Sequence, residues 1–359
     1  MPESVADARE GIPAACLGEL LIDMVPDPVG VPLAEVAAFR PATGGAPANV
    51  AAGLARLGDR CRFIGKVGDD AFGRKAVQVL AAAGVQVDQV RFTAEARTTL
   101  AFVALQADGE RDFLFYREPG ADTLLRPEDL EPSTLAAAPI FHHGSISLIA
   151  EPARSATLTA LGWAHEGGAL VSYDPNLREP LWPGPSEAHR GIRSALPWTH
   201  ILKVSASELA FLVGEGARFE PPDREPEPAA CEAGAAELLE ALPGLVAVVV
   251  TFGRKGAAVQ TRAGWSFVGP FRVEARDATG AGDGFVAGLL HWIWRAARKE
   301  RVTPLARART LDRDGWAGAT RFAQAVGALT TTRYGAIPAL PTLREVAALL
   351  ADEGEMELL

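Results

Sequence analysis

The stretch from Asp277 to Phe285 holds the residues whose types and spacing best suit chemistry on a phosphate group. Small residues, three of them glycine, lead directly into the apolar and aromatic range 285–294, which predicts a helix. A small-residue loop that enters a helix leaves backbone N–H groups unpaired and directed at one point. Such a loop therefore predicts a binding hole for an anion such as phosphate.

Asp283 lies in the same turn, where its carboxylate would repel a phosphate if the loop only bound an anion. The carboxylate becomes useful if it takes a proton from a nucleophile that attacks that phosphate. A helix cap is the competing interpretation, because aspartate is favoured at helix N-termini. The loop by itself leaves both interpretations open.

The composition is that of a globular protein with a large core. The chain has 359 residues, enough for one large or two ordinary domains, with 48% hydrophobic and 22% charged residues. Its formal net charge of -10 argues against nucleic acid or an anionic membrane as a partner. An anionic nucleotide would have to be held by local groups.

The cysteines and the N-terminus indicate a cytoplasmic protein. Three widely spaced cysteines form neither a disulfide framework nor a zinc motif, which favours a reducing compartment. The N-terminal range 1–13 is acidic and has no apolar segment, so it does not resemble a signal peptide. No apolar run reaches the roughly 18 residues of a membrane span.

Strand, glycine turn and helix alternate along most of the chain, which is typical of a parallel α/β sheet. The expected strands are 14–25, 61–67, 140–143, 169–173, 201–204 and 245–250, and the expected helices are 48–57, 71–83, 152–166, 231–242, 285–294, 316–330 and one near the C-terminus. Hairpins are expected at 97–116, with its turn at 107–110, and at 257–271. We expect a surface loop at 214–227 and a solvated charged face at 295–314.

Ligands of open α/β sheets bind beyond the carboxyl ends of the strands. Polar residues and glycines gather at these ends, namely Asp23, Gly44 with Gly45, Asn176 with Arg178, Ser205 with Glu208, Thr251 with Gly253, and the range 277–283. Asn49 would lie in the first turn of the helix that follows Gly45, with its amide above the loop. This accumulation predicts an active site at one edge of the sheet.

Each of these residues also has a plainer explanation. Asp23 suits a turn, Glu208 suits a cap of its own helix, and Arg178 suits a surface ion pair. His142 and His143 suggest a metal, but no matching ligand spacing follows, which favours a buried pair at a strand end. No P-loop or protein-kinase signature is present, and Phe285 occupies the last glycine position of a G-x-G-x-x-G fingerprint.

Two stretches resemble the paired signatures of the ribokinase (PfkB) family of carbohydrate kinases. GGAPANVA, residues 44–51, resembles the N-terminal signature, and the range 277–288 resembles the C-terminal one. Further stretches between about Cys16 and Pro341 are similar to fructokinases of the plant and bacterial type, among them GELLIDMVP, ADGERDFLFYREPGAD and SYDPNLREPLWP.

The resemblance implies a ribokinase-like fold, a three-layer α/β/α sandwich with a mostly parallel central sheet and a small β lid. One kinase domain would span 14–350, with 1–13 and 351–359 as tails. The lid, formed by about 21–43 and 95–118, would cover the sugar and provide a homodimer contact.

The resemblance also assigns roles to individual residues. Asp283 would be the catalytic base, and the backbone N–H groups of Gly280, Ala281 and Gly282 would neutralise the transferring phosphoryl group. The sugar would be bound by Asp23, Gly44, Gly45, Asn49 and Arg178, the nucleotide by Ser205, Thr251, Gly253, Gly256 and Ala325, and metal ions by Glu208, Asp277 and Thr279. The implied cofactors are ATP, magnesium and, at Asp277 and Thr279, a monovalent cation such as potassium.

The chain departs from the family pattern at three positions. Ser205 stands where the family usually has asparagine in a motif tied to magnesium and phosphate, which puts direct magnesium handling by Ser205 in doubt. Ala278 and Gly284 replace other small residues and should keep the shape of the loop.

We therefore expect ATP-dependent phosphorylation of D-fructose to fructose 6-phosphate. One alternative is another sugar kinase of the same family, a ribokinase or a 2-keto-3-deoxygluconate kinase. Another is a catalytically silent sugar-binding scaffold on the same fold. Retention of Asp283 and of the whole glycine loop favours an enzyme, because a silent protein does not need the base.

Overall fold

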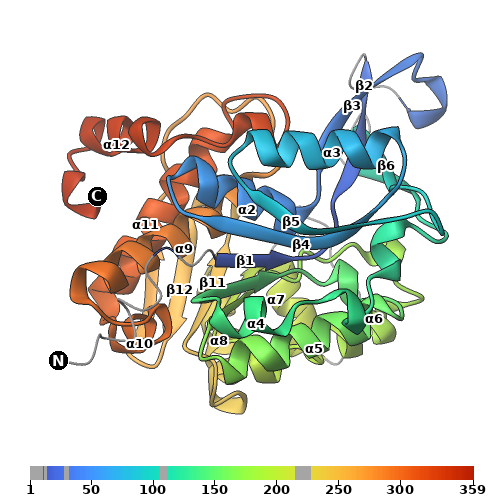
Figure 1. Cartoon of the computed structure of the whole chain (residues 1–359). Coiled ribbons are helices and arrows are strands. Elements are labelled where there is room, and N and C mark those ends of the chain that lie inside the picture. Colours follow the sequence, from blue (N-terminus) through green and yellow to red (C-terminus); the bar gives the residue numbers. More distant parts are fainter. Residues whose placement is uncertain (1–10, 12–13, 28–31, 106–110, 215–227) are drawn as a thin grey trace.

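The structure of the chain is a computed structural model that describes residues 11, 14–27, 32–105, 111–214 and 228–359 (Figure 1). The turn expected at 107–110, the loop expected at 214–227 apart from Gly214, and nearly all of the N-terminal tail lie outside these residues.

A nine-stranded central sheet organises the described residues, in the order β13-β12-β11-β10-β9-β8-β1-β4-β5. Its strands are β1 (Ala14–Leu17), β4 (Cys61–Gly68), β5 (Gln86–Thr93), β8 (Ile140–His143), β9 (Leu170–Tyr173), β10 (Ile201–Ser205), β11 (Ala247–Thr251), β12 (Ala257–Thr261) and β13 (Gly264–Val268). The pairs from β11 to β5 are parallel, whereas β12 and β13 add an antiparallel hairpin. The mostly parallel sheet is confirmed.

Helices cover both faces of this sheet (Figure 1). One face packs against α2 (Ala46–Arg56), α3 (Ala71–Ala82), α9 (Ala281–Glu300), α10 (Pro304–Thr310), α11 (Arg313–Thr330) and α12 (Leu343–Asp352), and the other against α4 (Pro132–Ala137), α5 (Ala153–Glu166), α6 (Pro185–Arg193), α7 (Ala206–Val213) and α8 (Pro228–Ala241). Strand β11 shows why two cores form, because successive side chains point to opposite faces. Val249 joins the first core, while Val248 and Val250 join the second. The three-layer arrangement is confirmed.

A small second sheet has the order β3-β2-β6-β7. Its strands are β2 (Leu21–Asp27), β3 (Ala38–Gly44), β6 (Leu100–Leu105) and β7 (Arg111–Tyr116). The two outer pairs are antiparallel, whereas β2 and β6 pair in parallel. This sheet corresponds to the expected lid.

Two expectations about strands were wrong. The apolar run 14–25 is not one strand, because the chain turns at Gly18 and passes from the central sheet to the lid. A side chain at Gly18 would meet Pro47 Cγ at 2.5 Å, so glycine is needed there. Strand β5 was not expected, because only Val90 and Thr93 of its residues are buried and its hydrophobic pattern is weak.

Helix α9 begins at Ala281, earlier than Phe285, so Asp283 lies inside its first turn. The charged range 295–314 holds the end of α9 and all of α10. The range 351–359 holds the end of α12 and a 3-10 turn whose Leu358 packs against the core.

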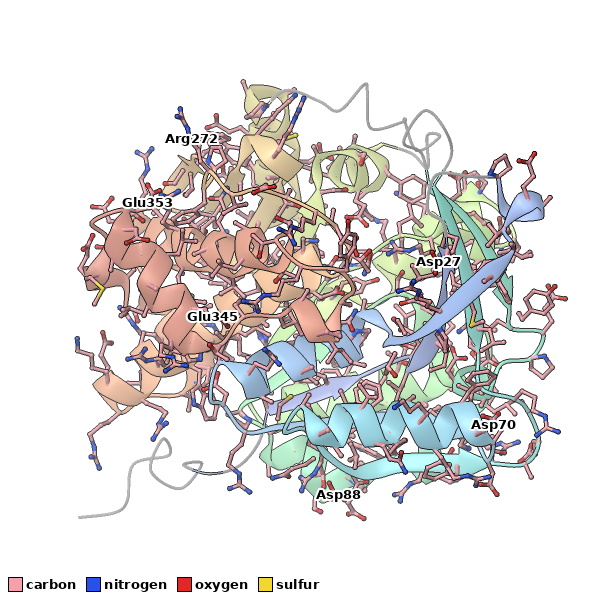
Figure 2. All side chains as sticks on the ribbon, turned by 90° about the horizontal axis from the view of Figure 1, so that it is seen from above. Asp27, Asp70, Asp88, Arg272, Glu345 and Glu353 are labelled. Carbon is pink, nitrogen blue, oxygen red and sulfur yellow. The ribbon has the colours of Figure 1, made fainter. Side chains whose placement is uncertain are left out.

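Charged side chains such as Asp88, Arg272 and Glu353 are exposed (Figure 2). None of the helices in the described ranges is long and apolar enough to cross a bilayer.

Candidate active site

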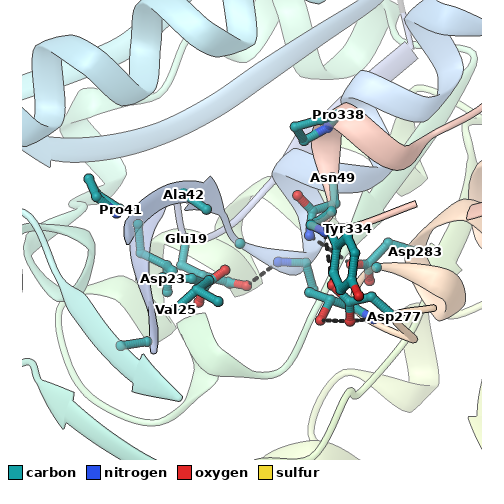
Figure 3. Close-up of a pocket in the computed structure, with 18 of the residues that line it drawn as sticks. Glu19, Asp23, Val25, Pro41, Ala42, Asn49, Asp277, Asp283, Tyr334 and Pro338 are labelled. Atoms are coloured by element: carbon teal, nitrogen blue, oxygen red, sulfur yellow. Dashed lines mark hydrogen bonds between the residues drawn. The ribbon is translucent and has the colours of Figure 1, made fainter. Parts of the chain in front are cut away.

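A cavity of about 500 Å³ lies between the lid and the N-terminus of α9 (Figure 3). Predicted site residues line it from several elements, namely Asp23, Gly45, Asn49, Arg178, Asp277, Thr279, Gly280 and Asp283. The fold thus brings together predicted site residues that are far apart in the sequence.

The N-terminus of α9 forms one wall of the cavity. Gly280 is its N-cap residue with a φ of 76°, and a side chain there would meet Ala336 Cβ at 2.9 Å. The first N–H groups of a helix have no partner four residues back, so they are available to an anion. The N–H of Ala281 is the exception to that availability, since it donates to the Ala278 carbonyl at 3.2 Å.

Asp283 is buried in this first turn and accepts a hydrogen bond from Asn49 of α2, with 2.8 Å between Nδ2 and Oδ2 (Figure 3). The carboxylate therefore bonds to a different helix. This arrangement differs from the helix-cap interpretation, in which the carboxylate would bond to its own helix.

The surroundings of Asp283 raise the pKa of its carboxyl group to about 6. Burial is the main cause, and the negative charge of Asp174 adds to it, while the Asn49 hydrogen bond and the positive charges of Lys203 and Arg178 act in the opposite direction. A carboxylate with a pKa just below neutral pH is ionised in the cell and still able to accept a proton in catalysis.

Two glycines bring the backbone close to Asp23 and Glu19. A side chain at Gly44 would lie 2.2 Å from Asp23 Oδ2, and one at Gly45 would lie 2.3 Å from the Glu19 carbonyl oxygen. Gly45 also has a φ of 118°, which other residues rarely adopt. The glycine pair is therefore required for Asp23 and Glu19 to lie against the start of α2.

Arg178 belongs to a polar chain that begins inside the core. Lys203 Nζ forms a buried ion pair with Asp174 Oδ2 at 2.9 Å. Asp174 Oδ1 accepts from the Asn176 N–H at 3.2 Å, and Arg178 Nη1 donates to Asn176 Oδ1 at 2.6 Å. Asn176 and Arg178 line the cavity.

Sequence reasoning missed Lys203, although a lysine inside the apolar strand 201–204 was a usable signal. Burial lowers its pKa, but the carboxylates of Asp174, Glu208 and Asp283 outweigh burial and leave the pKa raised. A methyl group at Gly282 would lie 3.2 Å from Lys203 Nζ. A buried cation therefore lies directly beside the loop that begins α9.

Glu208 caps its own helix. Its Oε2 accepts from the Ser205 N–H at 2.8 Å and from Ser205 Oγ at 3.0 Å, and its Oε1 accepts from the Leu177 N–H at 2.7 Å. Ser205 also pairs with Thr251 in the register of β10 and β11, so both lie at the same edge of the sheet.

The remaining residues expected on the nucleotide side follow β11 or lie in α11. Gly253 is the first residue of a 3-10 turn and Gly256 is its C-cap, and their φ values are 53° and 123°. Ala325 is fully buried, so any contribution it makes must come through the packing of α11. Neither these three residues nor Ser205, Thr251 or Glu208 line the cavity described above.

Asp277 ties the loop before α9 to the loop around Gly335. Its Oδ1 accepts from the Thr279 N–H at 2.9 Å and from Thr279 Oγ1 at 2.6 Å, and its Oδ2 accepts from the Gly335 N–H at 2.8 Å.

No group of three or more His, Cys, Asp or Glu residues within the described ranges could hold a metal ion. Burial lowers the pKa of His142 and of His143 to about 3, so both are neutral.

Comparisons with known proteins identify the family of the chain. The sequence matches the family described as "pfkB family carbohydrate kinase" over residues 13–343. It is 46% identical over 335 residues to the probable fructokinase-4 of Arabidopsis thaliana, covering 93% of this chain and 95% of that protein. It is 47% identical over 333 residues to the fructokinase-2 of Solanum habrochaites, covering 93% and 94%.

Solved structures of similar proteins share the fold. The fructokinase of Xylella fastidiosa with bound ATP has a TM-score of 0.81 at 35% identity, covering 95% of this chain and 99% of that one. A fructokinase double mutant of Vibrio cholerae O395, in a form with fructose, ADP and a potassium ion bound, has a TM-score of 0.76 at 31% identity, covering 98% and 100%. The chain belongs to the pfkB family and is a carbohydrate kinase.

Proposed function

We propose that this kinase transfers the γ-phosphoryl group of ATP to D-fructose and releases fructose 6-phosphate and ADP. The observation that carries the proposal is the hydrogen bond of Asn49 to the buried Asp283 carboxylate, beside the N-terminus of α9. The fructokinase names of similar plant and bacterial proteins support fructose as the sugar.

In the proposed reaction, Asp283 takes the proton of the sugar 6-hydroxyl while the oxygen of that hydroxyl attacks the γ-phosphorus. The bond between that phosphorus and the β–γ bridging oxygen breaks, and ADP leaves. Free N–H groups in the first turn of α9, with Gly280 and Gly282 at its start, stabilise the charge on the transferring group. Lys203, next to Gly282, adds a positive charge to the same place.

Asp23, Gly44, Gly45, Asn49 and Arg178 are the proposed sugar residues. Asp23, Asn49 and Arg178 supply acceptors and donors around the cavity, which Gly45 also lines. Gly44 does not line the cavity, but its lack of a side chain leaves room for the Asp23 carboxylate. A sugar whose hydroxyl groups do not match would leave a buried polar group unpaired, which is a strong source of discrimination.

Ser205, Thr251, Gly253, Gly256 and Ala325 are proposed for the nucleotide side. Magnesium is usually bound through substrate phosphates and one or two carboxylates. Glu208 fits this role only in part, because three hydrogen bonds already use its oxygens.

Asp277 and Thr279 are proposed for a monovalent cation. Asp277 fits such an ion, since a carboxylate offers about four lone-pair positions. A bound cation would stabilise the loop that Asp277 already ties to Gly335. The potassium ion in the Vibrio cholerae fructokinase structure supports the same proposal.

We also propose a homodimer through the lid and a cytoplasmic location. Val25, Leu114 and Tyr116 are large apolar side chains of the lid that stay exposed in the single chain. The cysteines, Cys16, Cys61 and Cys231, are buried thiols, which fits a reducing compartment. Light scattering of the purified protein would test the dimer.

A panel of sugars in an assay that couples ADP release to NADH oxidation tests the function. We expect kcat/KM for D-fructose to exceed the values for D-ribose and 2-keto-3-deoxygluconate by at least about a hundredfold, as hydrogen-bonded sites allow. A higher value for either of the other sugars would favour the alternative kinase. ADP release with none of the sugars would favour the silent scaffold.

A further inference from the structure

Glu19 is a buried acid at the point where the chain leaves β1 for the lid. Its side chain is inside the protein, and the residue lines the cavity near Asp23 (Figure 3). One oxygen, Oε1, accepts a hydrogen bond from the Ala46 N–H at 2.6 Å. The other, Oε2, is buried and has no hydrogen-bond partner among the described residues.

The start of α2 needs an acceptor from elsewhere in the chain. Ala46 is the first residue of α2, and its N–H has no partner inside the helix. The N-cap residue is Gly45, which has no side chain to cap the helix, and Pro47 has no N–H group. Glu19 therefore caps α2 from a distant position in the sequence.

The first turn of α2 also carries Asn49. The Asn49 N–H donates to the Gly45 carbonyl at 2.8 Å, so the backbone of this turn is continuous from the glycine to the asparagine. The Asn49 side chain then donates to Asp283. A chain of contacts runs from the Glu19 carboxylate through the α2 backbone to Asp283.

We propose that Glu19 is a positioning residue for phosphoryl transfer, which fixes the first turn of α2 and thereby holds Asn49 against Asp283. The proposal rests on the proposed function, in which Asp283 is the base. Glu19 acts through Ala46 and Asn49 and needs no contact with the reacting atoms.

Glu19 and Asp283 have different charged neighbours. A substitution at Glu19 is therefore not expected to act on Asp283 mainly through electrostatics. Glu19 is close to Asp122 and Arg117, which form their own buried pair at 2.7 Å. Asp283 faces Asn49, Asp174, Lys203 and Arg178. The hydrogen bonds along α2 are the direct connection between them.

The test compares pH profiles of kcat for Glu19→Leu and Glu19→Gln. Leucine removes the acceptor, so Asn49 loosens and Asp283 loses a hydrogen bond that lowers its pKa. We expect the acid-side midpoint to rise by about half a pH unit and kcat to fall about tenfold, a loss expected when a supporting contact is removed. Glutamine keeps an acceptor oxygen at the same length, so its profile should stay within about 0.2 pH units of wild type.

Two further variants make the test specific. Asp312→Leu is the matched control, because Asp312 caps α11 through the Gly315 N–H at 2.8 Å, whereas the start of α9 lies against Gly327, near the other end of α11. It should lower the melting temperature without moving the midpoint. Glu19→Leu combined with Asn49→Ala should shift the midpoint no further than Asn49→Ala does.

A midpoint in Glu19→Leu equal to that of wild type would overturn the proposal, as would full additivity with Asn49→Ala. If Glu19→Leu does not fold, Glu19→Asp takes its place, since the shorter side chain withdraws the acceptor from Ala46. Activity of Asp283→Asn reports separately on the base. An inactive Asp283→Asn beside an unaltered Glu19 variant would reject only the role of Glu19.

Discussion

Asn49 and Asp283 are 234 positions apart in the sequence, and their side chains meet at 2.8 Å. The contact requires α2 and α9 to pack closely, which Gly53 permits. A side chain at Gly53 would lie only 2.6 Å from Ala287 Cβ. The packing of these two helices thus brings Asn49 and Asp283 together in the wall of the cavity.

The protonation of Asp283 should set the acid limb of the activity. Its pKa is raised to about 6, so the base is progressively protonated and inactive as the pH falls through that value. We expect kcat with saturating fructose to halve near pH 6 and to drop about tenfold for each further pH unit. Asn49→Ala should move this midpoint upward. The ionisation of ATP affects wild type and Asn49→Ala equally, so it does not contribute to the difference between their midpoints. A flat profile down to pH 4.5 would contradict the assignment.

Gly44→Ala should impair sugar binding. The added methyl group would lie 2.2 Å from Asp23 Oδ2, so the carboxylate has to move. We expect KM for fructose to rise about tenfold or more, in line with the loss of one hydrogen bond to a charged group, while KM for ATP stays unchanged. Gly162→Ala is the control, because nothing lies within 4 Å of its added methyl group. Equal fructose KM values in both variants would show that Asp23 does not bind the sugar.

Lys203→Met should reduce both stability and turnover. It leaves Asp174 as an unpaired buried carboxylate, and breaking a buried ion pair costs about 3–5 kcal/mol. Lys203→Met with Asp174→Leu removes both charges and should recover part of the unfolding free energy in urea, without recovering kcat. Full recovery of kcat in the double variant would limit the pair to a structural role.

Glu19→Gln should alter how stability depends on pH. The Glu19 pKa rises from its ordinary 4.5 to about 7, mainly through burial, so the folded protein binds this proton more tightly than the unfolded chain. The stability contributed by the proton is complete below pH 4.5 and is lost as the pH rises through 7. The melting temperature of Glu19→Gln relative to wild type should therefore increase from pH 5 to pH 8. A constant difference over that range would contradict the raised pKa.

The sequence was sufficient for the α/β architecture and for much of the cavity. Continuous apolar runs such as 245–250 are typical of strands buried on both faces. Glycine-containing stretches mark the starts of α2 and α9, where Gly45 and Gly280 are the N-cap residues. Strand β5 was missed because an edge strand with one exposed face lacks such a run.

Glu19 and Lys203 were missed for another reason. Their importance depends on tertiary contacts with Ala46 and Asp174, which no local pattern encodes. The early start of α9 follows from the left-handed Gly280 and its close contact with Ala336, and that contact too appears only in the folded chain.

The most direct test of the account is Asp283→Asn, measured for turnover and for fructose binding. Asparagine keeps the size of the side chain and an acceptor for Asn49 but cannot take the proton. We expect kcat to fall about a hundred- to ten-thousandfold, the range for loss of a general base, while the Kd for fructose by calorimetry changes less than about threefold. Turnover at the wild-type rate would contradict the account.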